Sequence, residues 1–166
     1  MAATFGIDFG TTNSLVSIVG LDPETHKDRL YRMTQPDNRP HPSVVWYSVG
    51  KTVAGQLAKE QLDRHELGVS GDIVRSPKRF LGSPVGIPVG GVTRPTKEVV
   101  ADLLRFLMDD ARSRGLVGNK FESAVISIPV SMRGAARAEL REAAKQAGIR
   151  IHQFVHEPLA ALYGYL

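Results

Sequence analysis

The sequence has no cysteine among its 166 residues. This absence excludes disulfides, cysteine nucleophiles and zinc sites with cysteine ligands. No apolar run reaches the roughly 18 residues that a membrane-spanning helix needs. The first ten residues also lack the basic start and apolar middle of a secretory signal peptide. We therefore expect a cytoplasmic protein.

Aromatic residues are scarce, at 7% of the chain, and none alternates with the densest basic cluster, residues 75–79. Single-stranded nucleic acids are usually bound by basic grooves with interleaved aromatic side chains. The net charge of +4 is spread along the chain and is compatible with phosphate-bearing ligands. We expect neither a nucleic acid nor a membrane as a partner.

The first 35 residues predict three β-strands, at 4–9, 14–19 and 30–33, with a tight turn over Gly10–Asn13. Residues 36–95 are less regular and predict an inserted small subdomain. Within it, residues 43–49 favour a strand, 54–65 a short amphipathic helix, and 82–95 a loop or hairpin rich in glycine and proline.

From residue 96 the pattern is more regular. A helix is expected to begin with Thr96 as its N-cap and to end near Gly115. One face of this helix is apolar: Val100, Leu103, Leu104, Leu107, Met108 and Ala111. A strand over 121–128, stopped by Pro129, then precedes a helix over 133–147 that is closed by Gly148.

A strand over 149–155 and a last helix, with Pro158 in its first turn, complete the chain, and we expect Leu166 to cut this helix short. The order βββαβαβα is typical of an α/β lobe with a mixed sheet, as in ribonuclease-H-like and actin-like ATPase folds. The core would comprise residues 1–35 and 96–166.

The segment GIDFGTTNS, residues 6–14, carries the strongest chemical pattern. A turn at Gly10 would let the backbone N–H groups of Thr11, Thr12 and Asn13 approach a phosphate closely. Asp8 would then lie near the phosphates, where a carboxylate is useful if Mg²⁺ intervenes. Alternatively, these side chains only stabilise a hairpin turn, and their spacing does not decide between the two interpretations.

Other nucleotide and metal motifs fail on spacing. Gly50-Lys51-Thr52 ends like a P-loop, but Val45 stands where that motif needs glycine and no helix is expected to follow. His152 and His156 would share one strand face without a third ligand, which argues against a metal site.

Two further charged residues have two interpretations each. Lys78 could stabilise the charge on a phosphate leaving group, although a lone lysine is ordinarily solvated at the surface. Glu157, just before Pro158, could order water or metal, or could simply complement the dipole of the helix that follows.

Five motifs in chain order resemble the first lobe of the N-terminal ATPase domain of the 70-kDa heat-shock chaperone family. They are GIDFGTTNS, NRPHPSVVWY with VAGQLAKEQ, SPKRFLG, AVISIPVSMRGAARAELREAAKQAG, and IHQFVHEPLAALYGY. The resemblance implies an actin-like ATPase lobe of a molecular chaperone. It also implies ATP or ADP as the ligand, with Mg²⁺ and a monovalent cation such as K⁺.

The resemblance assigns a role to each matching position. The first phosphate loop corresponds to Gly10, Thr11, Thr12 and Asn13. Asp8 corresponds to the carboxylate that holds Mg²⁺ through water, and Lys78 and Glu157 correspond to the catalytic lysine and glutamate. Pro129 and Arg137 correspond to residues that relay the nucleotide state to the peptide-binding domain.

The chain departs from the family pattern at five positions: Met132, Arg133, Gly134, Gln153 and His156. In the family these positions serve interdomain coupling and co-chaperone docking, so coupling of the usual kind is in doubt. The inserted subdomain is also shorter than in typical members.

The family's second phosphate loop, second lobe and peptide-binding domain would all lie beyond Leu166. We therefore expect the chain alone to bind nucleotide weakly and to hydrolyse little or none, because such a site clamps ATP between two lobes. Co-chaperones and unfolded peptides would be partners only of a longer parent protein. The alternatives are a non-catalytic, partner-binding or self-associating lobe, and a fragment of a sugar or acetate kinase of the same superfamily.

Overall fold

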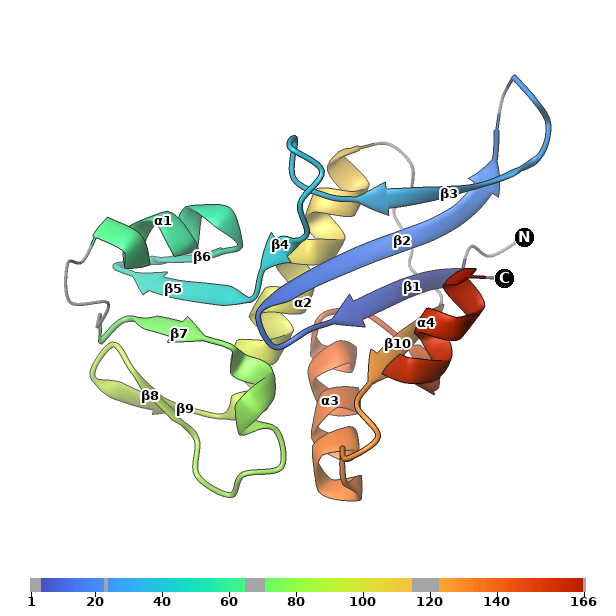
Figure 1. Cartoon of the computed structure of the whole chain (residues 1–166). Coiled ribbons are helices and arrows are strands. Elements are labelled where there is room, and N and C mark those ends of the chain that lie inside the picture. The colour runs from blue at the N-terminus through green and yellow to red at the C-terminus, as the bar shows by residue number, and fades with distance from the viewer. Residues whose placement is uncertain (1–3, 23, 65–70, 115–122, 166) are drawn as a thin grey trace.

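Alternating apolar residues build the centre of the sheet. The computed structural model describes residues 4–22, 24–64, 71–114 and 123–165 (Figure 1). In β1 (Thr4–Phe9) and β10 (Ser123–Ile128), every second side chain is buried. The buried set is Phe5, Ile7, Phe9, Ala124, Ile126 and Ile128. This period of two gives each strand one face toward the core.

The main sheet is mixed and has the order β11-β10-β1-β2-β3. Its remaining strands are β2 (Asn13–Leu21), β3 (Asp28–Met33) and β11 (Ile151–His156), and the short β4 (His41–Pro42) pairs with β2. Strands β1, β10 and β11 run parallel, whereas β1, β2 and β3 are antiparallel neighbours. The carboxyl ends of the three parallel strands therefore lie at one edge of the sheet.

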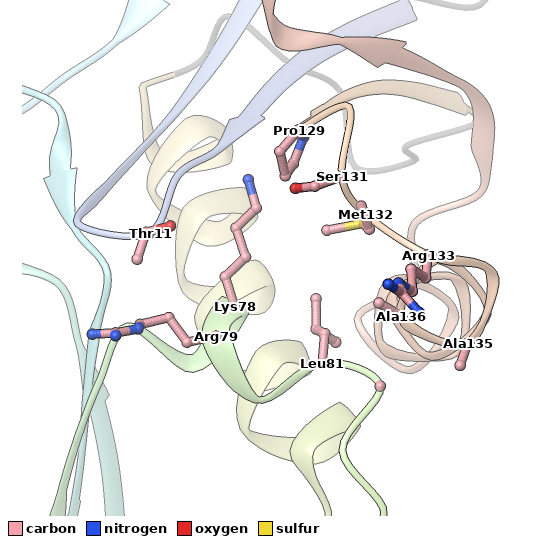
Figure 2. A pocket seen from close by; sticks show the side chains of 11 residues that line it. Thr11, Lys78, Arg79, Leu81, Pro129, Ser131, Met132, Arg133, Ala135 and Ala136 are labelled. Carbon is pink, nitrogen blue, oxygen red and sulfur yellow. The ribbon is translucent and has the colours of Figure 1, made fainter.

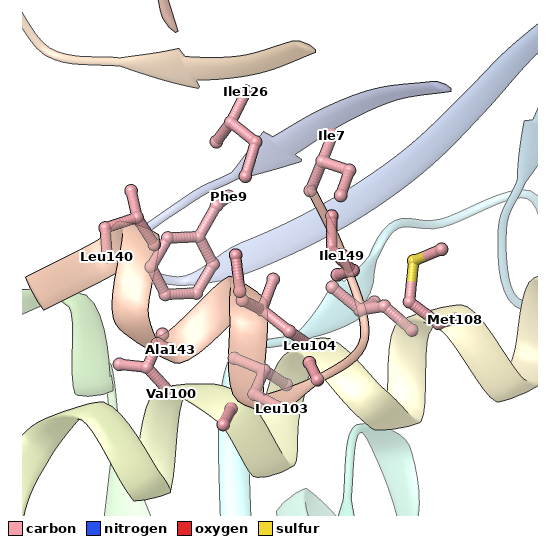
Figure 3. Packing of buried hydrophobic residues seen from close by; sticks show 14 of the residues in the cluster. Ile7, Phe9, Val100, Leu103, Leu104, Met108, Ile126, Leu140, Ala143 and Ile149 are labelled. Carbon is pink, nitrogen blue, oxygen red and sulfur yellow. The ribbon is translucent and has the colours of Figure 1, made fainter. Parts of the chain in front are cut away.

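Two helices, α2 (Thr96–Ser113) and α3 (Gly134–Gln146), pack together on one face of this sheet, and α4 (Glu157–Tyr165) lies against β10 and β11 on the other (Figure 1). The predicted apolar face of α2 is confirmed, since all six of its residues are buried. Its contacts with β1 and α3 form the centre of the core (Figure 3).

Of the two predicted helix caps, the one at the C-terminus of α3 is confirmed and the one at the N-terminus of α2 is wrong. Gly148 follows α3 with a φ of 76°, a left-handed conformation that suits glycine. Thr96 is not an N-cap, because it is the first helical residue after Pro95 and makes no capping hydrogen bond. Its hydroxyl instead donates to the carbonyl of Phe80 at 3.5 Å. The predicted helix end at Gly115 lies outside the described residues.

Residues 44–94 add two small sheets. Strands β5 (Val44–Ser48), β6 (Lys51–Ala54) and β7 (Ile73–Arg75) form a three-stranded sheet beside α1 (Gln56–Arg64). A 3₁₀ helix, η1 (Pro77–Phe80), leads to the hairpin of β8 (Ile87–Val89) and β9 (Val92–Arg94). The α/β class with a mixed sheet and small inserted sheets is thus confirmed.

Within the described parts of the chain, no helix is both long and apolar enough to cross a bilayer.

Candidate functional site

The parallel strands bring three distant segments to one edge of the main sheet. β1 ends at Phe9 before the Gly10 turn, β10 ends at Ile128 before Pro129, and β11 runs directly into Glu157 at the start of α4. Ligand sites of α/β proteins commonly lie at the carboxyl ends of parallel strands. This edge of the sheet is therefore the candidate location for a binding site.

The turn after β1 needs a residue without a side chain at position 10. A Cβ atom on Gly10 would lie 2.0 Å from the backbone oxygen of Asn13. Thr11, Thr12 and Asn13 are all exposed, although Asn13 already belongs to β2. The turn thus presents its backbone and side chains at the surface, as a phosphate-binding turn must.

A residue that the sequence interpretation missed holds this turn in place. The Ser43 hydroxyl donates to the carbonyl of Gly10 at 2.9 Å, and the Ser43 amide donates to the carbonyl of Thr12 at 2.8 Å. Ser43 and Ser14 also share a buried hydroxyl hydrogen bond of 2.9 Å. Nothing in the sequence points to Ser43, because the contact joins segments 29 residues or more apart.

Asp8 lies on the α4 side of the sheet, opposite Ser127 in the register of β1 and β10. Its carboxylate is exposed and accepts a hydrogen bond of 2.6 Å from the Ser127 hydroxyl. No group of three or more potential metal ligands occurs in the described part of the chain, so an all-protein metal cage is absent there. A single exposed carboxylate fits Mg²⁺ that is held mainly by water and phosphate oxygens.

Lys78 is not a solvated surface residue. Its side chain is only 6% exposed, and its ammonium nitrogen lies 2.8 Å from the Glu157 Oε1 atom, whose side chain is 43% exposed. The same nitrogen lies 5.8 Å from the centre of the Phe9 ring. The two predicted catalytic residues, 79 positions apart in the sequence, therefore form one ion pair.

This geometry is produced by the local structure of η1. Ser76 adopts a left-handed backbone conformation, with φ of 52°, and Pro77 starts the 3₁₀ helix that carries Lys78. Pro77 and Lys78 are both buried. Glu157 meets the amine from the first turn of α4, where its charge also suits the helix N-terminus. The position at the helix start agrees with the dipole interpretation of Glu157, and a role in ordering water or metal stays a prediction.

A pocket of about 430 Å³ opens beside this ion pair. Thr11 and Lys78 line one side, and the segment that follows β10 lines the other, through Pro129 and Ser131 among others. Figure 2 shows the Lys78 amine pointing toward Pro129 and Ser131. A hydroxyl, an ammonium group and the exposed turn thus face one space of the size of a small ligand.

The two residues predicted to relay the nucleotide state differ in their position relative to this pocket. Pro129 lines the pocket. Arg137 does not, but its Nε atom donates to the carbonyl of Met132 at 3.0 Å and so fixes the loop that follows β10. Met132 and Arg133, two of the departures from the family pattern, line the pocket themselves.

The Gly50-Lys51-Thr52 segment is not a P-loop, because Gly50 lies in a hairpin turn and Lys51 begins strand β6.

A scan against models of known protein families finds none that matches this chain.

Proposed function

We propose that this chain is the phosphate-binding lobe of an ATP-dependent molecular chaperone with an actin-like ATPase domain, similar to the 70-kDa heat-shock family. The observation that carries the proposal is the 2.8 Å pair of Lys78 and Glu157, which lies beside Thr11 at the carboxyl edge of the sheet. The sheet order supports the actin-like assignment.

In this proposal the Gly10 turn donates backbone hydrogen bonds to the nucleotide phosphates, and the hydroxyls of Thr11 and Thr12 add side-chain donors. The buried Lys78 ammonium group places a positive charge where negative charge grows as the γ-phosphate leaves. Glu157 fixes the lysine, and its second carboxylate oxygen orients the attacking water. Water forms a new bond to the γ-phosphorus and passes one proton to the phosphate product, while the bond to the β-phosphate oxygen breaks and ADP departs with that electron pair.

Asp8 and the phosphates would hold Mg²⁺ through water, and the ion would neutralise phosphate charge. A monovalent cation such as K⁺ would lie in the same cluster. Catalysis of this kind is almost entirely positioning. In a longer parent protein a second lobe would complete the clamp and hydrolysis would control peptide binding, whereas the chain alone binds weakly.

Calorimetric titration of the 166-residue chain with Mg-ATP and Mg-ADP tests this proposal. We expect saturable binding with a dissociation constant of roughly 0.1–1 mM, weakened at least about tenfold by Asp8→Ala and by Thr12→Ala. Asp63→Ala, which removes an exposed carboxylate of α1, is the matched control and should bind like the wild type. Equal binding by all four proteins would contradict the assignment, as would no heat of binding.

A second candidate function is a partner-binding or self-associating lobe. Three exposed apolar side chains favour it: Leu159 and Leu162 on α4 and Val130 after β10. Uncovered apolar groups on one side of a domain commonly mark an interface. Sedimentation velocity tests this second function, because wild-type self-association that Leu162→Glu reduces would support it. A wild-type protein that stays monomeric at all concentrations would argue against a self-associating lobe.

A further inference from the structure

The second hollow of interest lies away from the Lys78 site, between the β5-β6-β7 sheet and the β8-β9 hairpin. It has a volume of about 530 Å³ and shares no lining residue with the pocket beside Lys78. Its walls come from the ends of β5 and β9, the β5-β6 turn, β6, and the turns before β7 and after β8. The amide of Gly90 donates to the carbonyl of Gly71 at 2.6 Å and joins the hairpin to the sheet.

Arg94, the last residue of β9, is the unusual group in this pocket. Its guanidinium carbon lies 4.3 Å from the centre of the Tyr47 ring, a cation–π contact that holds the group beside the pocket wall. Its Nε atom is buried and, among the described residues, has no hydrogen-bond partner. Buried donors in native proteins are almost always paired, so the unpaired Nε atom singles out Arg94, which is only partly buried and lines the pocket, as a candidate ligand-binding residue.

The neighbours of Arg94 add positive charge and hydroxyl groups. Lys51 and Thr52 line the pocket from β6, and both are exposed. The one carboxylate in the lining belongs to Asp72, whose Oδ2 atom already accepts a hydrogen bond of 3.0 Å from Trp46 Nε1. The Tyr47 hydroxyl is likewise occupied, because it donates to Asp102 at 2.8 Å. Two cationic side chains, Arg94 and Lys51, therefore line the pocket, together with one carboxylate that already accepts a hydrogen bond.

We propose that this pocket binds the phosphate group of a small molecule, with Arg94 and Lys51 as its main ligands. An arginine presents a planar pair of donors that matches phosphate oxygens, and a lysine adds a point charge. The volume exceeds that of a bare phosphate and leaves room for an attached organic group. The Gly50-Lys51-Thr52 segment would thus contact phosphate without any P-loop. The inference does not depend on the proposed ATPase function.

Trp46 provides a specific signal for this site. It is the only tryptophan in the chain, and its indole nitrogen is bonded to Asp72 in the pocket wall. We would titrate the protein at constant ionic strength with inorganic phosphate, ribose 5-phosphate and uncharged ribose while following Trp46 fluorescence. A saturable change is expected with both phosphates and none with ribose. If ribose 5-phosphate binds more tightly than inorganic phosphate, the ligand is a phosphomonoester. If the two bind equally, the ligand is free phosphate.

Variants locate the binding site. Arg94→Gln should weaken phosphate binding at least about tenfold and Lys51→Gln about threefold, whereas Arg64→Gln, at the exposed end of α1, is the charge-matched control and should have no effect. Because Lys51 is exposed, its variant keeps the test decisive if Arg94→Gln perturbs the hairpin. The proposal is overturned if no fluorescence change occurs up to roughly 10 mM phosphate, or if Lys51→Gln and a folded Arg94→Gln bind like the wild type.

Discussion

The Lys78 amine is withdrawn from water but keeps a charged partner. Burial of a charge is costly unless it is paired, and Glu157 supplies the pairing from a more exposed position. Lys78 also lines the open pocket, where we expect its charge to attract a second anion. The burial and pairing of Lys78 support its proposed role, whereas a lone lysine in the sequence gives no sign of either.

Glu157→Gln should therefore destabilise the fold by about 1–3 kcal/mol, because it leaves the Lys78 charge buried without a counter-charge. Asp63→Asn breaks an exposed pair with Lys59 and should cost less than about 0.5 kcal/mol. Urea unfolding of both variants measures the difference. Equal small effects would show that Lys78 does not need its partner.

Asp22 has a shifted pKa. The backbone N–H of Thr25 and then the guanidinium of Arg29 lower the pKa of this carboxyl from 3.8 to about 2. Because the folded value is the lower one, the contribution to stability is present above pH 3.8 and is lost as the pH falls toward 2. NMR titration of the Asp22 side-chain carbon should give a midpoint near 2, and Arg29→Ala should raise it. A wild-type midpoint at the ordinary value would contradict this assignment.

The turn between β1 and β2 has no room for a side chain at position 10. Gly10→Ala would push a methyl group to 2.0 Å from the Asn13 backbone oxygen. We expect a loss of about 2–4 kcal/mol of stability and weaker nucleotide binding, because the turn must open. Thermal unfolding and calorimetry measure both effects.

Gly134→Ala is the matched control for this substitution. Gly134 begins α3, and a Cβ atom there would have no neighbour within 4 Å. The variant should be as stable as the wild type or gain about 0.5–1 kcal/mol through helix propensity. A similar loss in both variants would mean that glycine at position 10 has no special role.

Elements with a clear period could be predicted from the sequence, and those set by distant contacts could not. The apolar face of α2 identified this helix, because its period follows from the backbone geometry, and β1 was predicted from its β-prone residues before a turn. Thr96 was misassigned as a cap because its hydroxyl meets the Phe80 carbonyl, a contact of tertiary origin. Likewise, the spacing of Lys78 and Glu157 could not reveal their ion pair, and Ser43 was missed altogether.

For the whole molecule, the two small sheets and the main sheet share one hydrophobic core. Val45, Ile87 and Val89 belong to the same buried cluster as Ile7 and the α2 residues. An inserted region that packs into a common core should not unfold by itself. We expect Trp46 fluorescence, which reports on β5, and far-ultraviolet circular dichroism to give coincident urea transitions. Separate transitions would show that residues 44–94 are an independent unit.

The central claim is that the edge formed by the Gly10 turn and Lys78 binds nucleotide phosphates. Backbone amide NMR of the ¹⁵N-labelled chain during titration with Mg-ADP tests it most directly. We predict that the largest shift changes fall on residues 11–13 in the Gly10 turn and on four amides that line the pocket beside Lys78, namely Lys78, Arg79, Ser131 and Met132. Changes confined to other surfaces, or no changes at millimolar nucleotide, would contradict the account.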